Sequence, residues 1–237
     1  MPPHSQTLEV WGDLACFSRP ELKVERLSYP CITPSAARGV FDAIYAKPRE
    51  FRWQITRIEL LAVPSFVALR RNETKEKVNL SAVAYWMAGT ADVRPIFADG
   101  VGEDEKGRTQ RQTIALRAPR YRITADIRPW PGFEDRHASL EAQFVRRAEK
   151  GKCFYQPYFG CREFVAFFSL TSSHRPPADV DLDVGLMLYD VFDLSRPGSS
   201  TDRPAVSLFR ASIRGGILNV PDYRDSAVLK PELAGGD

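Results

Sequence analysis

The stretch "TPSAARGVFDAIYAKP" (residues 33–48) decides the fold, because it predicts one helix with a defined start, a defined end and one buried face. Thr33 is a natural N-cap, Pro34 suits the first helical position, and Pro48 cannot continue a helix. The apolar side chains recur at helical spacing and form a single stripe, made of Ala37, Val40, Phe41 and Ile44. This helix is expected to pack with its stripe against a sheet.

Strand patterns lie on both sides of this helix. Residues 6–18 are rich in strand-forming residues and predict a strand that is kinked at Gly12. Residues 51–70 place alternate apolar side chains on one side of an extended run, which Pro64 breaks. They predict a strand, a turn and a second apolar piece. The helix therefore connects two strands.

The second half of the chain repeats this order. Residues 112–130 are dense in β-branched residues and arginine and predict another strand. Residues 134–154 predict a helix that ends at Gly151, and its buried face consists of Leu140, Phe144 and Ala148. Residues 157–170 predict a loop that leads into a buried strand. The order strand, helix, strand, strand, helix, strand is typical of an α+β, ferredoxin-like (RRM-type) antiparallel sheet with two helices.

Two further regions interrupt or follow this pattern. Residues 71–111 are charged and glycine-rich around the apolar island 80–89, and they predict a long loop or a poorly ordered insertion. Beyond residue 172 only short strand patterns follow, separated by Pro, Gly and Ser, and they predict a small C-terminal all-β sheet. The expected domains are residues 1–172 and residues 173–237.

The composition is that of a soluble globular protein. Of the 237 residues, 43% are hydrophobic and 27% are charged, and no apolar run approaches the roughly 20 residues that span a bilayer. The N-terminus lacks the pattern of a secretion signal, so the cytoplasm is the expected location. Because 33 basic residues face 30 acidic ones, a basic surface must arise from clustering rather than from net charge.

The cysteines and histidines do not predict a metal site or another cofactor. Four cysteines stand far apart without a CxxC pair, and the chain has only three histidines. In a reducing compartment we expect free and mostly buried thiols at Cys16, Cys31, Cys153 and Cys161.

Two stretches together resemble a known family. Residues 9–48 ("EVWGDLACFSRPELKVERLSYPCITPSAARGVFDAIYAKP") and 146–168 ("RRAEKGKCFYQPYFGCREFVAFF") resemble the CRISPR-associated repeat-processing proteins of subtype I-C, called Cas5d or Dvulg, in the RAMP superfamily. The resemblance implies a metal-independent endoribonuclease that cleaves precursor CRISPR RNA within the repeat hairpin. It also implies that the protein stays bound as a subunit of the type I-C interference complex, with duplex DNA as a further candidate partner.

The resemblance also implies the catalytic residues. The family places a tyrosine at the end of the first helix, which corresponds to Tyr45, and a Lys-His pair near the start of the second helix. The sequence offers Arg136 and His137 for that pair, about three residues earlier than the family spacing. Because three residues are nearly one helical turn, the pair still points to roughly the same face. Strict register would place Ser139 and Leu140 there instead.

Cleavage without a metal gives each of these residues a task. The 2′-hydroxyl must lose a proton, the phosphorane charge must be stabilised, and the leaving oxygen must gain a proton. His137 can exchange protons near neutral pH, and the guanidinium of Arg136 can bind phosphate oxygens. Tyr45 is a poor base, so a hydrogen bond to the hydroxyl or the phosphate is its expected role. The structural alternatives are a core-edge tyrosine and a solvated histidine.

Several residues are candidates for RNA binding. The resemblance places Gly160 in a glycine-rich loop where the backbone can approach RNA. Arginines on or before the predicted third strand and on the second helix can contact phosphates, namely Arg108, Arg111, Arg117, Arg120, Arg122, Arg128, Arg146 and Arg147. Aromatic side chains can stack on bases, and the candidates are Trp11, Trp53, Tyr158 and Phe159. Ordinary solvated strands and core packing also produce these patterns, and Arg162 can pair with Glu163.

Two other functions use the same fold. One is a non-catalytic RNA-binding subunit of the interference complex, and only the catalytic residues separate it from the nuclease. The other is an RRM-like binding module unconnected with CRISPR, against which the two motifs argue. The sequence therefore favours the nuclease.

Overall fold

The computed structural model describes residues 5–22, 24–74, 77–94, 96–98, 108–170, 175–198 and 202–231. The helices are α1 (Pro34–Ile44), α2 (Leu80–Met87) and α3 (His137–Glu149), and a short 3-10 helix (Glu134–Arg136) precedes α3. The strands of the first half are β1 (Gln6–Trp11), β2 (Leu14–Ala15), β3 (Arg26–Leu27), β4 (Phe51–Leu60), β5 (Phe66–Thr74) and β6 (Arg108–Arg117). The strands of the second half are β7 (Arg120–Pro129), β8 (Phe167–Leu170), β9 (Leu182–Asp190), β10 (Ser207–Ile213), β11 (Ile217–Asn219) and β12 (Val228–Leu229).

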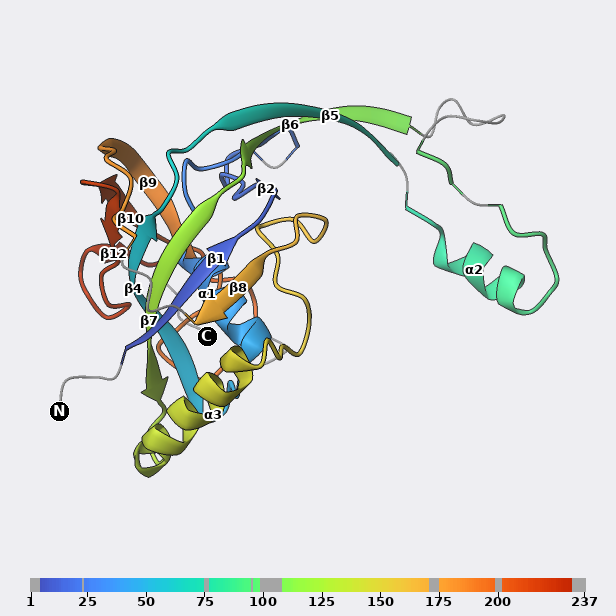
Figure 1. The fold of residues 1–237 in the computed structure, drawn as a ribbon. Helices are drawn as coiled ribbons and strands as arrows, with labels where there is room; N and C mark the ends of the chain where they lie inside the picture. Colours follow the sequence, from blue (N-terminus) through green and yellow to red (C-terminus); the bar gives the residue numbers. More distant parts are fainter. Residues whose placement is uncertain are drawn as a thin grey trace.

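A five-stranded antiparallel sheet forms the centre of the molecule (Figure 1). Its strand order is β11-β4-β7-β1-β8. Side chains alternate along β1 and β7, so that Leu8 and Val10 pack beside Tyr121 and Ile123 on one face. The α+β class predicted from the sequence is confirmed. The order β4-β7-β1-β8, with α1 before β4 and α3 before β8, is compatible with the predicted ferredoxin-like arrangement.

Helices α1 and α3 share one face of this sheet. The Phe41 ring on α1 stacks on the Phe144 ring on α3, with centroids 5.5 Å apart. Trp53 of β4 contacts both rings, at 4.9 and 4.7 Å. The predicted helix signals are confirmed as well: the Thr33 hydroxyl accepts the Ala36 N–H at 3.2 Å, and Gly151 follows α3 with φ +61°.

The region between β4 and β7 differs from the prediction. Residues 66–74 and 108–117 pair in register as the long arm β5–β6, and α2 lies beyond its far end (Figure 1). The prediction of a loop over residues 71–111 is therefore wrong for residues 71–74 and 108–111, which belong to strands β5 and β6. The expected single strand over 112–130 is also wrong, because Ala118 has φ +46° and divides it into β6 and β7. These two strands belong to different sheets.

The C-terminal residues contribute to two sheets. Strands β9, β10 and β12 form a small sheet of their own, as the sequence predicts. Strand β11 instead pairs with β4 at the edge of the central sheet. The domain boundary at residue 172 stays a prediction. The pairing of β11 with β4 joins the two expected domains across this boundary.

The segment that carries "PYFGCREF" also departs from expectation. Strand β8 is not a buried strand: among the described strands it pairs with β1 alone, at the edge of the sheet, and alternate side chains along it are exposed. The preceding loop folds back on itself, and the N–H of Phe159 donates to the Phe164 carbonyl at 2.8 Å. All four cysteines are free, with Cys16 and Cys31 buried and the other two partly buried. Over the described ranges, no helix has both the length and the apolar character that a bilayer crossing needs.

Candidate functional site

Tyr45 is the residue at which α1 ends. Its backbone is extended (φ −154°, ψ 117°), and its carbonyl accepts the Trp53 indole N–H at 2.8 Å. The ring is only 5% exposed and lies 5.5 Å from the Phe51 ring. Within the part of the chain that the structure describes, the phenolic hydroxyl has no hydrogen-bond partner. The fold therefore fixes the ring, while none of the described residues binds its hydroxyl.

The C-terminal end of α3 contacts the chain beside Tyr45. The Arg147 guanidinium donates through Nε to the Ile44 carbonyl at 2.5 Å and lies 4.1 Å above the Phe154 ring. The Phe154 N–H donates to the Ala43 carbonyl at 2.7 Å. These contacts satisfy carbonyl groups of the last turn of α1, which have no partner within the helix. Arg147 thus holds the end of α1, and with it the position of Tyr45.

Arg136 and His137 lie at the opposite end of α3. Arg136 forms an ion pair of 3.0 Å with Glu50, and Glu50 also pairs with Lys47 at 3.1 Å. His137 is the first residue of α3, and its Nε2 lies 3.5 Å from Glu141 Oε1. Ten residues of helix, about 15 Å of rise, separate His137 from Arg147. In the described ranges, no hydrogen bond or ion pair joins Tyr45 to Arg136 or His137.

The predicted RNA-binding arginines occupy three different places. Arg111 lies on the arm and pairs with Glu73 at 3.3 Å, and Arg117 is exposed at the end of β6. The side chain of Arg108 lies outside the described residues. Arg146 is exposed on α3 and hydrogen-bonds Gln143. Because the arm and α3 belong to separate parts of the fold, these arginines do not form one patch.

On the helix-free face of the sheet, the arginines are paired with acidic residues. Arg120 hydrogen-bonds Glu9 at 2.5 Å and lies 5.1 Å above the Trp11 ring. Arg122 pairs with Glu59 at 2.6 Å, and Arg128 pairs with Asp126 at 3.0 Å. Each carboxylate is at most 10% exposed, whereas the side chains of Arg120 and Arg128 are 39% and 43% exposed and that of Arg122 is 13% exposed.

Gly160 has a structural reason to be glycine. Its φ is +81°, and a Cβ at this position would overlap the carbonyl oxygen of Cys16. The same contact includes a hydrogen bond of 3.0 Å from the Cys16 N–H to the Phe159 carbonyl. The chain's own packing therefore requires this glycine, and its contact with RNA stays a prediction.

The structure decides between the alternatives that the sequence left open for several neighbouring side chains. Trp53 and Phe159 are buried in the core, because they face α1 and the Phe17 ring, and they cannot stack on a base. Glu163 pairs with Arg71 of the arm at 2.6 Å rather than with Arg162. Trp11 is partly buried, and Tyr158 is 36% exposed.

A groove that sequence patterns did not reveal runs along α1. Two adjoining pockets of about 420 Å³ each share the lining residues Arg38, Asp42, Tyr155 and Phe192. One pocket reaches Cys16 and Gly160, and the other reaches Ala46 and Pro48, directly after Tyr45. We call these two pockets together the α1 groove. It connects the two segments on which the sequence-based prediction rests.

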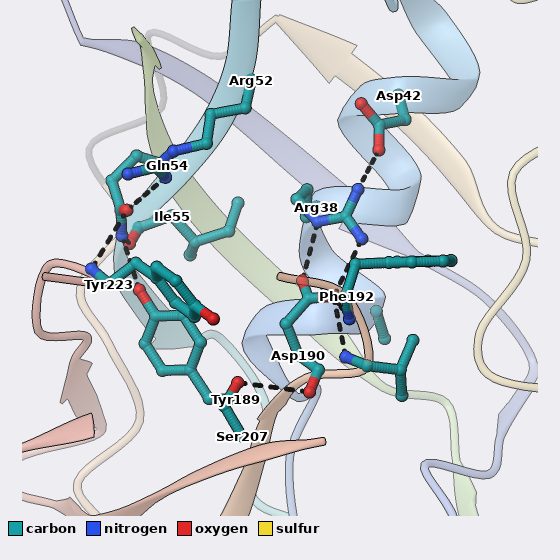
Figure 2. A network of polar contacts seen from close by, with 12 residues as sticks. Arg38, Asp42, Arg52, Gln54, Ile55, Tyr189, Asp190, Phe192, Ser207 and Tyr223 are labelled. Carbon is teal, nitrogen blue, oxygen red and sulfur yellow. Dashed lines mark hydrogen bonds and ion pairs between the residues drawn. The ribbon is translucent and has the colours of Figure 1, made fainter. Parts of the chain in front are cut away.

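An ion-pair network holds the floor of the α1 groove in place (Figure 2). Arg38 bonds Asp190 through Nε at 2.7 Å and through Nη2 at 3.1 Å, and it bonds Asp42 through Nη1 at 2.5 Å. Asp190 also accepts the N–H groups of Val191 and Phe192 at 2.8 and 3.0 Å. The turn that carries Phe192 is thereby fixed to α1. The sequence alone shows only part of this network. Arg38 and Asp42 are four residues apart on α1, a spacing at which side chains can meet, but Asp190 at the end of β9 reaches Arg38 only in the tertiary structure.

Burial and neighbouring charges shift the pKa values of Arg38 and Asp42 in opposing directions. Burial alone would lower the pKa of Arg38, but the carboxylates of Asp190 and Asp42 outweigh it and raise that pKa. Burial raises the pKa of Asp42, Arg38 opposes that shift, and the charge of Asp190 adds to it. One guanidinium therefore serves two carboxylates, those of Asp190 and Asp42. Across the described residues, no three His, Cys, Asp or Glu side chains group as a metal site would need.

Comparisons with known proteins agree with this architecture. A protein of Thermus thermophilus named CRISPR pre-crRNA endoribonuclease Cas5d is 39% identical over 226 residues, which are 90% of each chain. A protein of Mannheimia succiniciproducens with the same name is 37% identical over 225 residues, 91% of this chain and 94% of that one.

Solved structures show the same fold at lower identity. A crystal structure of a CRISPR-associated protein superposes with a TM-score of 0.64 at 18% identity and covers 95% of this chain and 96% of the other. A functionally uncharacterized Streptococcus mutans protein superposes with a TM-score of 0.62, also at 18% identity, over 95% and 97% of the two chains. The family described as CRISPR-associated protein (Cas_Cas5) matches residues 7–221. The chain therefore belongs to the Cas5d family of CRISPR-associated proteins.

Proposed function

We propose that this protein is a metal-independent endoribonuclease that cleaves precursor CRISPR RNA within the repeat hairpin. After cleavage it remains bound to the RNA as a subunit of the type I-C interference complex, in the cytoplasm, where duplex DNA is a further partner. The observation that carries the proposal is Tyr45, whose ring is fixed in the core while its hydroxyl has no partner among the described residues. The names of the two relatives support it, since both are called pre-crRNA endoribonucleases.

The proposed reaction needs no group beyond the chain, the RNA and water. The 2′-oxygen forms a bond to the adjacent phosphorus while the bond to the 5′-oxygen breaks, which leaves a 2′,3′-cyclic phosphate and a 5′-hydroxyl. The 2′-hydroxyl loses one proton and the 5′-oxygen gains one; His137 makes one of these two transfers and the solvent makes the other, while Arg136 binds the phosphate oxygens on which charge develops. Tyr45 donates a hydrogen bond to the reacting phosphate.

Cationic residues follow both chain segments of this region in the sequence and favour an RNA substrate. Lys47 and Arg49 follow Tyr45, while Lys150 and Lys152 follow α3. The hydrogen bond from Phe154 to Ala43 brings these two segments together. Since phosphate contacts dominate the affinity for nucleic acids, binding should weaken steeply as the salt concentration rises.

One observation favours the non-catalytic RNA-binding subunit as the second candidate. If strict family spacing applies, Ser139 and Leu140 occupy the positions of the Lys-His pair. The Ser139 hydroxyl donates to the Arg136 carbonyl at 2.7 Å, and Leu140 is buried in the core at 1% exposure. Neither side chain can transfer a proton at neutral pH.

The deciding experiment is cleavage of the cognate repeat RNA in EDTA. It compares the intact protein, His137→Ala, and RNA with a single 2′-deoxy nucleotide at the scissile position. We expect the intact protein to cut the normal RNA, the deoxy RNA to survive, and His137→Ala to cut about 100-fold more slowly or worse. RNA that is bound but never cut would identify the non-catalytic subunit.

A further inference from the structure

Two of the four cysteines meet in the fold although they lie far apart in the sequence. Cys16 follows β2, and Cys161 lies in the loop between α3 and β8. The Cys16 N–H donates to the Phe159 carbonyl at 3.0 Å, and Gly160 packs so closely on Cys16 that a Cβ would overlap its carbonyl oxygen. This main-chain contact brings the next residue, Cys161, to Cys16, and the two thiols share a hydrogen bond. The two sulfur atoms are therefore already in contact in the reduced protein.

Polar and cationic groups lie next to this pair of thiols. The Arg26 guanidinium donates to Cys161 Sγ at 3.5 Å, and the Ser18 hydroxyl lies 3.5 Å from Cys16 Sγ. The hydrogen bond from Cys161 lowers the pKa of Cys16 most, burial opposes this shift, and the nearby hydroxyl and guanidinium groups add to it. The same hydrogen bond raises the pKa of Cys161. Cys16 is therefore the thiol that ionises first, and the thiolate is the reactive form of cysteine.

A small oxidant can reach this pair of thiols. Cys16 is only 1% exposed, but it lines the pocket of about 420 Å³ at one end of the α1 groove, and Cys161 is partly exposed. The other two cysteines differ in one property each. Cys31 is fully buried, and burial raises its pKa to about 12. Cys153 is partly exposed, but in the described ranges no hydrogen bond joins it to another cysteine.

We propose that Cys16 and Cys161 are a redox-active pair that hydrogen peroxide converts into a disulfide. The Cys16 thiolate attacks one peroxide oxygen, so that an S–O bond forms, the O–O bond breaks, and the departing hydroxide takes a proton to become water. The Cys161 thiol then loses its proton and attacks the resulting sulfenic acid, so that the S–S bond forms and the hydroxyl group leaves as a second water. Two thiols and one peroxide thus give one disulfide and two waters, and the sulfurs supply the two electrons that reduce the peroxide.

The disulfide fastens together parts of the fold that otherwise contact each other without a covalent bond. Cys16 follows β2, which pairs with the end of β6. The loop of Cys161 also carries Glu163, which pairs with Arg71 of β5 at 2.6 Å. The bond therefore fixes the loop before β8 to the β5–β6 arm. Because disulfides in reducing compartments are mostly transient and redox-sensing, this bond is expected to form under oxidative stress and to open again when thiols reduce it.

Peptide mapping of the full-length protein tests the pair. The reduced protein is treated with increasing hydrogen peroxide in EDTA, the remaining thiols are blocked with N-ethylmaleimide, and the unreduced digest is examined by mass spectrometry. We expect a peptide crosslinked between Cys16 and Cys161, which dithiothreitol separates. Cys153 is the internal control for exposure without a partner thiol. The pair should lose its thiols at least about tenfold faster than Cys153.

Three variants test the order of the two steps. In Cys161→Ser the hydroxyl can still donate to Cys16 but no disulfide can form, so the sulfenic acid should persist at Cys16 and be trapped by dimedone. Cys16→Ser should give no more dimedone adduct at Cys161 than at Cys153. Arg26→Gln removes a cation beside the pair, so it should slow formation of the disulfide several-fold. A dimedone adduct that forms at Cys161 as readily in Cys16→Ser would overturn the assignment of Cys16 as the attacking thiol.

Thermal unfolding of the unmodified protein adds a measurement that needs no variant. Oxidation should raise the unfolding temperature, because the crosslink closes a long loop of the unfolded chain without distorting a pair that is already in contact. A lower unfolding temperature after oxidation, disulfides spread over several pairs, or equal oxidation of all four cysteines would overturn the inference. None of these measurements contains RNA, so their outcome is independent of the proposed function.

Discussion

The two ends of α3 contact the same segment, residues 44–50, in different ways. At the C-terminal end, the partly buried Arg147 is fixed by a main-chain carbonyl and an aromatic ring. At the N-terminal end, the side chains of Arg136 and His137 are 44% and 35% exposed and lie beside the carboxylates of Glu50 and Glu141. The first end holds the structure in place, and the second leaves charged and titratable groups accessible to a substrate. Helix α3 thus separates the support of Tyr45 from the proposed proton transfer.

The substitution Tyr45→Phe should have the largest effect. It removes the hydroxyl and keeps the buried ring against Phe51, so we expect cleavage to slow by about 100- to 1,000-fold with RNA affinity nearly unchanged. Single-turnover cleavage and a binding titration measure the two quantities. A loss of affinity without a specific loss of cleavage would assign Tyr45 a structural role.

Arg136→Ala tests the accessible end of α3. Because the guanidinium is 44% exposed and shares its charge with Glu50, we expect cleavage to fall by a smaller factor, about 30- to 100-fold. The free energy of unfolding should change by less than about 1 kcal/mol, as for other exposed ion pairs. Arg136→Lys, which keeps the charge, is the control. Normal cleavage by Arg136→Ala would remove this residue from the mechanism.

Arg147→Ala tests the fixed end. It removes a charged hydrogen bond to the Ile44 carbonyl and the contact with Phe154, so we expect unfolding to become easier by about 2 kcal/mol. Urea denaturation followed by tryptophan fluorescence measures this change. A variant with unchanged stability and reduced RNA affinity would make Arg147 a phosphate contact instead of a support.

Arg146→Ala, one residue earlier, should have the smallest effect. Arg146 is exposed and hydrogen-bonds only Gln143 in the part of α3 that the structure describes, so stability should change by less than about 0.5 kcal/mol. If Arg146 contacts a phosphate, the substitution lowers RNA affinity a few-fold. The slope of log affinity against log salt concentration then becomes shallower by about one unit. Destabilisation equal to that of Arg147→Ala would erase the distinction between these neighbours.

Local signals in the sequence were sufficient for the helices that build the core. Thr33, Pro34 and the stripe ending at Ile44 define α1, and Gly151 marks the end of α3, because capping and helical periodicity act over a few residues. The same signals place Tyr45 directly after the last helical residue, whereas its candidate catalytic role came from the resemblance to the family. The sequence therefore predicts well those features, such as helix starts, helix ends and buried helix faces, that residues close together in the chain determine.

Contacts between distant segments could not be read in the same way. The division of residues 112–130 depends on one positive φ at Ala118, which is not a glycine and gives no turn signal. The arm was missed because its strands are far apart in sequence and leave alternate side chains exposed. The α1 groove depends on Arg38 meeting Asp190, which lies 152 residues later. No local pattern specifies such a pair.

Strand β11 has a consequence for how this protein is made. It closes one edge of a sheet whose other strands lie within the first 170 residues, and it pairs with β4 about 160 positions earlier in the chain. During translation, β4 must therefore wait with an unpaired edge until residue 219 has left the ribosome. Exposed strand edges invite association with other chains, so the interval before β11 emerges is the period in which a nascent chain is most exposed to aggregation and to chaperones.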